Sequence, residues 1–545
     1  MEPLLKMRKI HIEGLSDEKW SPIINGIDLT LARGEVLGLI GESGAGKSTL
    51  GIASMAFTRQ GCRISSGSIV FEGQELMGAP REALRKIRGN RIAYVAQSAA
   101  ASFNPAHRLI KQYAEAPVQH GVMSFEQAVK EAKIIYKQLL LPDPDHIGYR
   151  YPHQVSGGQL QRAMVAMAMA CRPDLIIFDE PTTALDVTTQ IEVLAAIKHI
   201  VRQFNTAAIY ITHDLAVVAQ IANRIMVLRY GNLVEESATG EMIANPKEDY
   251  TRRLLSVRKL KEEKDLSQSE KDVILEVDNV TASYTGKENV LEDIDLKIRR
   301  GRTMALVGES GSGKSTLARV IMGLLPPIKG NVIYNDHQLS RDLKSRPKEQ
   351  LRVMQMIYQM PDTALNPKHK VSEIIGRPLQ FYFGMREKDR NKRVNELLEK
   401  IELSEKYFDR YPPELSGGEK QRICIARALA AEPDLIICDE VTSALDQLVA
   451  EEILKLLQDL QNELRVSYLF ITHDLATVKA ISDEIVVMLR GRIVEQGVNK
   501  VILAPPHHEY TELLLSSVPE MDPDWLDRLL KERKEKGKPS TIMDA

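Results

Sequence analysis

The stretch "GESGAGKST", residues 41–49, decides the fold, and it directly follows the apolar run "EVLGLI" at 35–40. Nearly the same nine residues, "GESGSGKST", recur at 308–316 behind "TMALV". The pattern G-x-x-x-x-G-K-[ST] after a buried strand is typical of a loop whose backbone N–H groups surround phosphate oxygens. Two copies therefore predict two nucleotide sites in one chain.

Each residue type in this loop has a physical task. Glycines let the backbone curl around the phosphates, and Lys47 or Lys314 reaches the β- and γ-phosphates. Ser48 or Ser315 is placed to ligate Mg²⁺, and the helix that follows adds the positive end of its dipole. The predicted nucleotide-binding residues of the loops are Gly41, Ser43, Gly44, Gly46, Lys47, Ser48 and Thr49, and Gly308, Ser310, Gly311, Gly313, Lys314, Ser315 and Thr316.

Size and composition indicate a multidomain globular protein. A chain of 545 residues exceeds what one hydrophobic core supports, and 43% hydrophobic with 27% charged residues is ordinary for a globular protein. A net charge of -2 argues against a nucleic-acid binder that relies on counterion release. We expect no signal peptide and no membrane span, because no apolar run approaches roughly 20 residues. The four scattered cysteines, Cys62, Cys171, Cys424 and Cys438, indicate neither disulfides nor a metal cluster.

The chain is a duplication of one unit. "VSGGQLQRA" at 155 returns as "LSGGEKQRI" at 415, "DLIIFDEPTTALD" at 174 as "DLIICDEVTSALD" at 434, and "ITHDLA" at 211 recurs at 471. These three pairs share an offset of 260, whereas the two loops differ by 267. A repeat of half the chain predicts two fused domains. We place them at 1–256 and 273–520, joined by a charged linker at 257–272 and followed by a polar tail at 521–545 that starts as a short amphipathic helix.

Each half alternates strand and helix patterns. Short unbroken apolar runs such as "DLIIFD" and "AAIYIT" are typical of strands buried on both faces of a parallel sheet. Between the loop and "SGG", apolar residues recur at helical spacing from Phe125 to Leu139. The pattern predicts an α/β domain with a helical insertion. We interpret the methionine-rich run "AMVAMAMAC" at 163–171 as core packing on a helix.

Two carboxylates end one buried strand in each half. Asp179 and Asp439 are placed to hold Mg²⁺, whereas Glu180 and Glu440 stand where a general base polarises an attacking water. Paired acids at a strand end are also compatible with simple solvation. Their place beside a phosphate loop favours the catalytic interpretation.

Further polar residues recur around the acids. His213 and His473 each follow an apolar strand in "ITHD", and their spacing from the acidic pair is the same in both halves. This repetition favours contact with a γ-phosphate over a structural role. Gln97 and Gln359 also end strands and are candidates to bridge metal, water and a neighbouring domain.

The "SGG" triplets are the most diagnostic element. Ser156, Gly157 and Gly158 open one helix, and Ser416, Gly417 and Gly418 open another, so each offers free N–H groups to an anion. Each half then holds two anion sites. Either both serve one ATP in the same half, or the "SGG" of one half completes the loop of the other.

With these motifs in this order, the chain resembles the ATP-binding subunits of ABC transporters. The resemblance implies two tandem ABC-type P-loop domains, each a RecA-like α/β core with a helical and an antiparallel β subdomain, that hydrolyse ATP with Mg²⁺. It implies a head-to-tail pairing of each loop with the opposite "SGG". One site would join Lys47, Asp179, Glu180 and His213 with Ser416 and Gly418, the other would join Lys314, Asp439, Glu440 and His473 with Ser156 and Gly158, and Asp186 and Asp446 would communicate between the halves.

Other segments resemble the dipeptide, oligopeptide and nickel branch of importers, among them "SFNPAHRLIKQYAEA" after Gln97 and the endings "NPKEDYTRRLL" and "PPHHEYTELLL". This implies two membrane-spanning permease subunits and an extracytoplasmic solute-binding protein as partners, no nucleic acid, and a place on the cytoplasmic face of the inner membrane, where only the permeases touch the bilayer. Peptides are the first expectation for the cargo. The iron–sulfur cysteines common in the branch are missing. One alternative is a soluble twin ABC ATPase acting on ribosomes or DNA. Another is a regulatory scaffold without turnover, and the retention of both glutamates and both histidines argues against it.

The halves depart from the family pattern at the adenine-stacking position. Tyr284 matches the aromatic residue that stacks on adenine, but the equivalent position in the first half is Asp17. Trp20 is the nearest substitute. Val441 replaces the proline that follows the glutamate in the first half, a change that removes no reactive group, so we expect two active sites.

Overall fold

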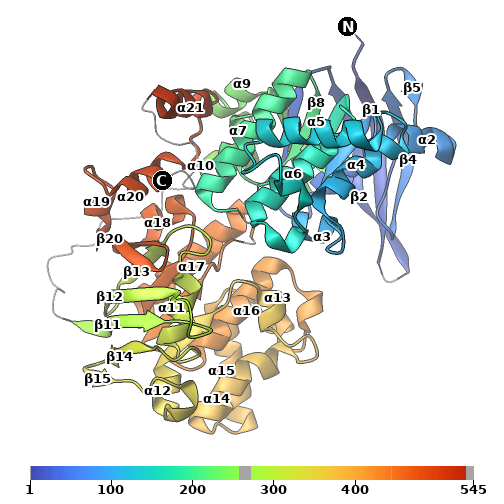
Figure 1. Cartoon of the computed structure of the whole chain (residues 1–545). Coiled ribbons are helices and arrows are strands. Elements are labelled where there is room, and N and C mark those ends of the chain that lie inside the picture. Colours follow the sequence, from blue (N-terminus) through green and yellow to red (C-terminus); the bar gives the residue numbers. More distant parts are fainter. Residues whose placement is uncertain (1, 17, 183–184, 257–271, 444, 536–545) are drawn as a thin grey trace. The chain divides into compact units, whose positions relative to one another are not determined.

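The structure is a computed structural model that describes residues 2–16, 18–182, 185–256, 272–443 and 445–535 (Figure 1). The chain divides into two compact units. The first comprises Met1–Ser256 together with Pro519–Ala545, and the second Val257–Val518. Almost all of the predicted linker, 257–271, and the chain end, 536–545, lie outside the described residues.

A six-stranded core sheet forms the centre of the first unit, in the order β10-β9-β3-β8-β7-β6. Its strands pair in parallel except β10, which runs antiparallel to β9. All five residues of β3, β7 and β8 are buried, which confirms the interpretation of the unbroken apolar runs. The strands are β3 (Val36–Ile40), β6 (Ile92–Val95), β7 (Leu175–Asp179), β8 (Ala207–Ile211), β9 (Arg224–Arg229) and β10 (Asn232–Ala238).

An antiparallel sheet, ordered β2-β1-β4-β5, packs its apolar residues into one core with β3, β7, β8 and β9. Its strands are β1 (Leu5–Ser16), β2 (Lys19–Leu31), β4 (Cys62–Phe71) and β5 (Gln74–Glu75). The helices of the first unit are α1 (Lys47–Ala53), α2 (Arg81–Ile87), α3 (Ala99–Ser102), α4 (Leu109–Gln119), α5 (Phe125–Gln138), α6 (Gly157–Met169), α7 (Val187–Phe204), α8 (Leu215–Ala219), α9 (Thr239–Ala244), α10 (Asp249–Ser256) and α21 (Trp525–Glu535).

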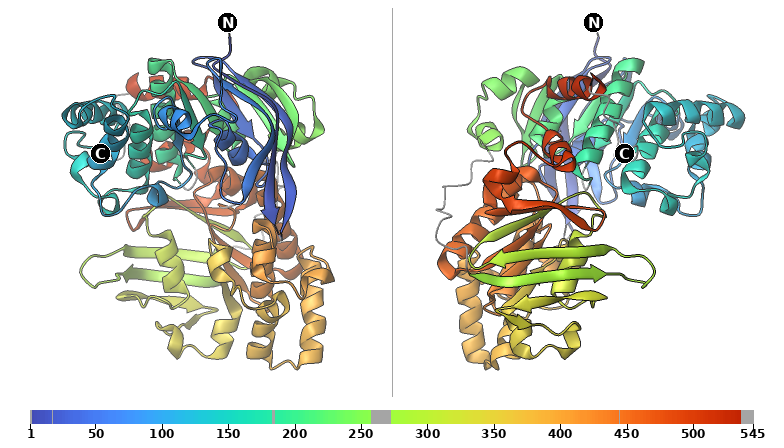
Figure 2. Two further views of the ribbon diagram at one scale, coloured as in Figure 1. Left: turned by 90° about the vertical axis from the view of Figure 1, so that its right-hand side faces the viewer. Right: turned by 60° about the vertical axis from the view of Figure 1, so that its left-hand side comes forward.

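The predicted helical insertion is present. Helices α3 to α5 lie apart from the antiparallel strands, on another side of the core (Figure 2). Ala128, Ala132 and Tyr136 of α5 are buried, as the helical spacing predicts, whereas Phe125 at its start is half exposed. The methionine-rich helix α6 buries Met164 and Met169, in agreement with core packing.

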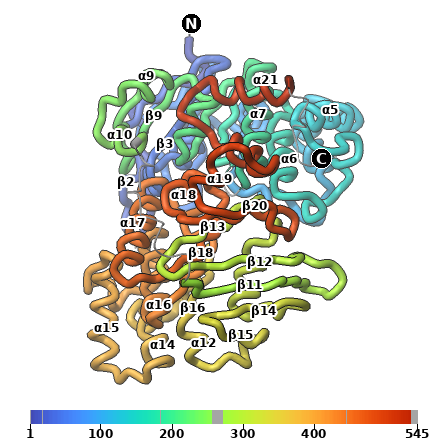
Figure 3. The backbone as a smooth tube through the Cα atoms, turned by 90° about the vertical axis from the view of Figure 1, so that its left-hand side faces the viewer, coloured from blue at the N-terminus to red at the C-terminus, as the bar shows by residue number. Residues whose placement is uncertain are grey.

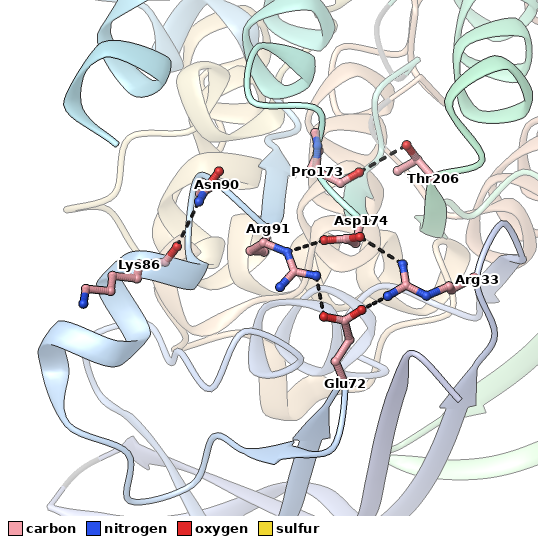
Figure 4. Close-up of polar contacts among 8 residues, drawn as sticks. All are labelled: Arg33, Glu72, Lys86, Asn90, Arg91, Pro173, Asp174 and Thr206. Atoms are coloured by element: carbon pink, nitrogen blue, oxygen red, sulfur yellow. Dashed lines mark hydrogen bonds and ion pairs between the residues drawn. The ribbon is translucent and has the colours of Figure 1, made fainter. Parts of the chain in front are cut away.

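An ion-pair network ties the antiparallel sheet of the first unit to the amino ends of β6 and β7 (Figure 4). Arg33 and Arg91 each pair with both Glu72, in the turn after β4, and Asp174, directly before β7. Single pairs at this exposure contribute little to stability, but four contacts among four side chains fix the geometry of the turn. The network lies at the end of the strands away from the carboxylates that end β7.

The second unit repeats this plan, with a core sheet in the order β16-β17-β18-β13-β19-β20 and an antiparallel sheet in the order β12-β11-β14-β15 (Figure 3). Its strands are β11 (Val273–Ala282), β12 (Leu291–Arg299), β13 (Thr303–Val307), β14 (Lys329–Tyr334), β15 (His337–Gln338), β16 (Met354–Ile357), β17 (Leu435–Asp439), β18 (Ser467–Ile471), β19 (Glu484–Leu489) and β20 (Arg492–Val498). Its helices are α11 (Lys314–Ile321), α12 (Lys348–Val353), α13 (Pro361–Ala364), α14 (Val371–Phe383), α15 (Glu387–Lys400), α16 (Gly417–Leu429), α17 (Gln447–Leu464), α18 (Leu475–Ile481), α19 (Asn499–Ile502) and α20 (Glu509–Ser516).

Among the described residues, no helix has the length and apolar character that a bilayer crossing requires. The four cysteines are free, and Cys171, Cys424 and Cys438 are buried. The same part of the chain contains no group of three or more His, Cys, Asp or Glu side chains arranged to hold a metal ion.

Candidate functional site

The first phosphate loop joins β3 to α1. Gly41 and Gly46 have φ values of +145° and +92°, and a Cβ on Gly41 would lie 2.1 Å from the carbonyl oxygen of Leu228, so only glycine fits there. Helix α1 has no side-chain cap on its first N–H groups, which leaves them available to an anion. Lys47 is buried, and its Nζ donates to the carbonyl oxygens of Gly41 (2.7 Å) and Glu42 (2.8 Å), which holds it over the loop.

The second loop, between β13 and α11, has the same construction. Gly308 and Gly313 have φ values of +150° and +105°, and α11 also begins without a side-chain cap. Lys314 Nζ donates to the carbonyl oxygens of Gly308 and Glu309, each at 2.7 Å. The remaining predicted loop residues, Ser43, Gly44, Thr49, Ser310, Gly311 and Thr316, lie in these two loops or the first turn of the helices.

The loop serine and the strand-end aspartate meet in both units. Ser48 Oγ donates to Asp179 Oδ1 at 2.6 Å, and Ser315 Oγ donates to Asp439 Oδ1 at 3.0 Å. Both aspartates are buried at the carboxyl ends of β7 and β17. Hydroxyl and carboxylate oxygens are hard donors that suit Mg²⁺, which commonly takes its other ligands from water and phosphate.

Glutamate, glutamine and histidine also converge on one point in each unit. Gln97 Nε2 donates to Glu180 Oε2 at 2.9 Å, and His213 Nδ1 lies 3.3 Å from Glu180 Oε1. Glu180 has φ +50°, and its N–H donates to the carbonyl oxygen of Ile211 at 2.9 Å, which turns the residue out of the sheet. The second unit has the same contacts, with Gln359 Nε2 2.7 Å and His473 Nδ1 3.4 Å from Glu440.

Burial and charge set the protonation of these groups. Burial acts to lower the pKa of His213, but the hydrogen bond and charge of Glu180 outweigh it and raise the pKa above its ordinary value. Glu440 raises the pKa of His473 in the same way against burial. Burial acts to raise the pKa of Glu440, and the hydrogen bond from His473 reverses this and lowers it. The protonated form of each histidine is therefore favoured, and at the second site so is the ionised form of Glu440.

Asp439 behaves differently from the neighbouring glutamate. Burial raises its pKa, and the charge of Glu440 adds to the increase, while the Ser315 hydroxyl only partly opposes both. A divalent cation would favour the ionised form.

The two "SGG" triplets cap the helices α6 and α16. Ser156 Oγ accepts from Gln159 N at 3.3 Å, and Ser416 Oγ accepts from Glu419 N at 3.4 Å. A Cβ on Gly158 would lie 2.2 Å from Thr189 Cγ2, so close packing of α6 on α7 explains this glycine. A Cβ on Gly157 would meet no described atom within 4 Å, so packing does not explain the other.

The triplet of the second unit repeats this contrast. A Cβ on Gly418 would lie 2.5 Å from Val449 Cγ1, whereas one on Gly417 would be 3.7 Å from the nearest described atom, Leu445 Cδ2. Asp186 and Asp446 cap α7 and α17, accepting from Thr189 N at 3.0 Å and Val449 N at 3.2 Å. The backbone N–H of each triplet serine also belongs to the cap, since Ser156 N donates to Gln159 Oε1 at 3.1 Å and Ser416 N donates to Glu419 Oε2 at 2.7 Å.

The two candidate aromatic residues have different surroundings. Tyr284 lies beside the second loop, since its hydroxyl is 3.3 Å from Thr316 Oγ1 and accepts from Arg319 Nη1 at 3.0 Å, and the ring is half exposed. Trp20 lies on β2, with the Arg63 guanidinium 4.1 Å from its ring centroid. Asp17 lies outside the described residues.

Four residues that touch these sites belong to none of the motifs. Tyr94 donates to Asp179 Oδ2 at 2.6 Å, and Arg59 Nη2 lies 3.5 Å from the same oxygen. Tyr250 accepts from Glu42 N at 3.3 Å in the first loop, and Tyr510 accepts from Glu309 N at 2.8 Å in the second. The repeat contained a clue to the tyrosines, because "DYT" at 249–251 returns as "EYT" at 509–511, again at an offset of 260.

Two P-loop α/β domains, each with a second helix that opens on Ser-Gly-Gly, define the class of ATP-binding cassette proteins. The sequence model of the family described as "ABC transporter" matches residues 24–183 and 291–443, and that of "Oligopeptide/dipeptide transporter, C-terminal region" matches 494–543. The chain therefore belongs to the ATP-binding proteins of ABC transporters, in the oligopeptide and dipeptide branch.

Relatives agree with this assignment. The chain is 38% identical over 542 residues, 92% of its length and 87% of the relative's, to the "Glutathione import ATP-binding protein GsiA" of Salmonella typhimurium (strain LT2). The protein of that name from Escherichia coli (strain K12) is 35% identical over 561 residues, covering 95% and 90% of the two chains. A solved structure of cbiO1 from Clostridium perfringens, part of the ABC transporter complex cbiONQ, is 30% identical over 43% of this chain and 91% of its own, with a TM-score of 0.40.

The chain is thus an ATPase that binds ATP and energises a peptide-type importer, and it works with membrane permease partners. The comparisons contradict the alternative of a soluble twin ABC ATPase acting on ribosomes, because the long relatives are import proteins.

Proposed function

We propose that both units hydrolyse ATP with Mg²⁺, and that the two sites drive import of peptides or similar small solutes. The observation that carries this proposal is the double recurrence of one polar arrangement: lysine over the loop, serine on aspartate, and glutamine and histidine on glutamate, with closely matching distances. A scaffold without turnover would place no such constraint on both glutamates.

The residues have separate tasks in this proposal. Ser48, Asp179 and Gln97 would hold Mg²⁺ at the first site, and Ser315, Asp439 and Gln359 at the second. The ion supplies positive charge beside the phosphates. Glu180 and Glu440 accept a proton from the attacking water, and the raised pKa values of His213 and His473 keep a positive charge available for the γ-phosphate. Tyr284 stacks on adenine at the second site, and Trp20 is the candidate at the first.

We further propose that each loop is completed by the "SGG" triplet of the other unit. The room for a Cβ at Gly157 and Gly417 supports this, since a Cβ would clash with no described atom of its own unit at either position. Two ATP molecules would then hold the units together, and loss of the γ-phosphate contact would release them. Asp186 and Asp446, at the caps of the adjacent helices, would transmit the state of one site to the other.

The partners follow from the family. We propose two membrane-spanning permease subunits and an extracytoplasmic solute-binding protein, with this chain on the cytoplasmic face of the inner membrane and in contact with the bilayer only through the permeases. The names of the long relatives refer to glutathione, a tripeptide, which makes small peptides the first class of cargo to test.

The proposed chemistry is tested by Glu180→Gln combined with Glu440→Gln. Glutamine keeps the size of the side chain but accepts no proton, so ATP binding should persist while turnover falls by about 10²-fold or more. The measurement is ATPase activity together with equilibrium binding of radiolabelled ATP. Substantial hydrolysis by the double variant would disprove the assignment of the bases.

The pairing of loops with triplets is tested by Gly157→Ala against Gly158→Ala. Gly158→Ala should destabilise the first unit, because its Cβ overlaps Thr189. Gly157→Ala should leave the melting temperature unchanged and still lower ATPase activity several-fold, because its Cβ would meet the nucleotide. If Gly157→Ala retained full activity, the triplet would not contact ATP. Gly417→Ala is the matched variant in the second unit.

A further inference from the structure

A face of the first unit formed by α7 and α8 is covered by the end of the chain. The covering part is the C-terminal segment, defined here as residues 519–535, which includes α21. Figures 1 and 3 show α21 beside α7, far in sequence from that helix. Trp525, Leu526 and Leu529 of α21 are buried, so the helix is packed and does not lie loosely on the surface.

Gln220, directly after α8, holds the backbone of this segment. Its Nε2 donates to the carbonyl oxygens of Glu520 (2.6 Å) and Asp522 (3.0 Å), and its Oε1 accepts from Leu526 N at 3.1 Å. The side chain is 1% exposed. A buried amide that is satisfied by three backbone groups of one segment fixes both the path and the register of that segment.

Charge adds to the contact. Lys198 Nζ of α7 lies 3.1 Å from Asp527 Oδ1, and Arg202 Nη1 lies 3.4 Å from Asp527 Oδ2. The Lys198 side chain is 8% exposed although it carries a charge, and it forms its ion pair with Asp527. Removing Asp527 would therefore leave a nearly buried ammonium group.

The second unit serves as a natural control for this surface. At the offset of 260, the positions of Lys198, Arg202 and Gln220 are occupied by Gln458, Asn462 and Ala480. The ion pair Arg162–Glu192 recurs as Arg422–Glu452 with the same 3.3 Å separation, but the glutamate side chain is 14% exposed in the first unit and 57% in the second. Burial lowers the pKa of Arg533 in α21, and the charge of Glu192 partly opposes this. The docking residues are thus specific to the first unit.

The other end of the connection is fixed in the second unit. Helix α20 buries Tyr510, Thr511 and Leu514, and the Tyr510 hydroxyl accepts from Glu309 N in the second phosphate loop. Ser517 is fully buried, and its Oγ donates to the carbonyl oxygen of Leu513 at 2.6 Å. Ser517 and Glu520 are three peptide steps apart, which span at most about 11 Å. The first connection, across 257–271, can span about 50 Å.

We propose that the α7–α8 face of the first unit is a docking surface for the chain's own C-terminal segment, which makes this segment a second and much shorter tether between the units. Only the consequence of this tether rests on the proposed function. When loss of ATP releases the units, the C-terminal segment limits how far they can separate.

The test compares chains ending at Val518 and at Glu535, each with nitroxide spin labels at Glu126→Cys on α5 and Lys392→Cys on α15, in a Cys62→Ser background. Electron–electron double resonance without nucleotide should give a distance distribution at least twofold wider for the chain ending at Val518. The chain ending at Glu535 should match the full chain. Equal distributions for the two truncated chains would overturn the proposal.

A charge exchange keeps the test valid if truncation impairs folding. Asp527→Lys should widen the distribution by repulsion from Lys198, and adding Lys198→Asp should narrow it again. Failure of the pair to restore the narrow distribution, with both variants folded by circular dichroism, would equally contradict docking. These measurements need no ATP hydrolysis, so their failure is distinguishable from failure of the proposed chemistry, which the glutamate variants report.

Discussion

The two strand-end aspartates occupy equivalent places but have different neighbours. Asp179 is contacted by Ser48, by the Tyr94 hydroxyl and by Arg59, whereas Asp439 accepts a hydrogen bond from Ser315. Tyr94 and Met356 occupy equivalent positions in the two core sheets, because Tyr94 pairs with Ile177 of β7 and Met356 pairs with Ile437 of β17. A phenol in one unit is a thioether in the other.

This difference shows what duplication preserved and what it changed. The groups that touch ATP in our proposal are identical in type and nearly identical in distance, whereas the side chains that support them have diverged. Asp439, which lacks a phenolic donor, has its pKa raised by burial and by Glu440. The two sites are therefore expected to bind Mg²⁺ unequally although they carry the same reactive residues.

The largest expected effect that separates the units is that of Tyr94→Phe. The variant removes one donor to a carboxylate that is 3% exposed, and losing a hydrogen bond to a buried charged group costs about 1–3 kcal/mol. We expect a lower unfolding midpoint for the first unit by calorimetry. Met356→Leu, at the matched position, should have little effect, because no hydrogen bond is lost and the volume is kept.

A result in which Tyr94→Phe and Met356→Leu shift the unfolding midpoint equally would remove the basis for the comparison. Met356→Tyr is the reverse test, because it gives the second unit the phenol that the first unit has at Tyr94. If the new hydroxyl reaches Asp439, this variant should stabilise the second unit and lower the pKa of that carboxyl from its raised value.

A smaller effect is expected at Arg59. Its guanidinium lies 3.5 Å from Asp179 and is 62% exposed, so its charge opposes a cation at the first site but is screened by water. In a Glu440→Gln background that silences the second site, Arg59→Met should lower the Mg²⁺ concentration for half-maximal ATPase activity about two- to fivefold. Arg59→Lys retains the charge and is the control. The effect should shrink in high salt, and an increase in the Mg²⁺ requirement would contradict it.

Short, repeated motifs were enough to select residues that the structure places in contact. Ser48 is hydrogen-bonded to Asp179, and Lys47 is held over its own loop by Gly41, while their tasks toward ATP stay a prediction. Tyr94 and Arg59 could not be found in this way. Tyr94 meets Asp179 because β6 pairs with β7, and Arg59 reaches it from the loop between α1 and β4, so neither contact is local in sequence.

The end of the chain illustrates a second limit. The pattern from Asp524 onward predicts a short amphipathic helix, and α21 is present at Trp525–Glu535. Nothing local indicates its partner, because Lys198 and Gln220 lie more than 300 residues earlier. Once the contact is known, the repeat explains these residues, because Lys198 and Gln220 are replaced by Gln458 and Ala480 at the equivalent positions of the second half.

The last prediction is that one feature does not differ between the units. Both histidines have raised pKa values in the folded state, so each contributes stability that is fully present below its unfolded pKa and is lost as pH rises through its folded pKa. The unfolding midpoint should therefore fall as pH increases from about 6 through the raised pKa values, and His213→Gln and His473→Gln should each remove a similar part of this dependence. Scanning calorimetry of the three proteins across this range measures it. If one variant by itself removed the whole pH dependence of the unfolding midpoint, only one histidine–glutamate pair would be ionised. The two sites would then differ in this pair as well as in the side chains around the strand-end aspartates.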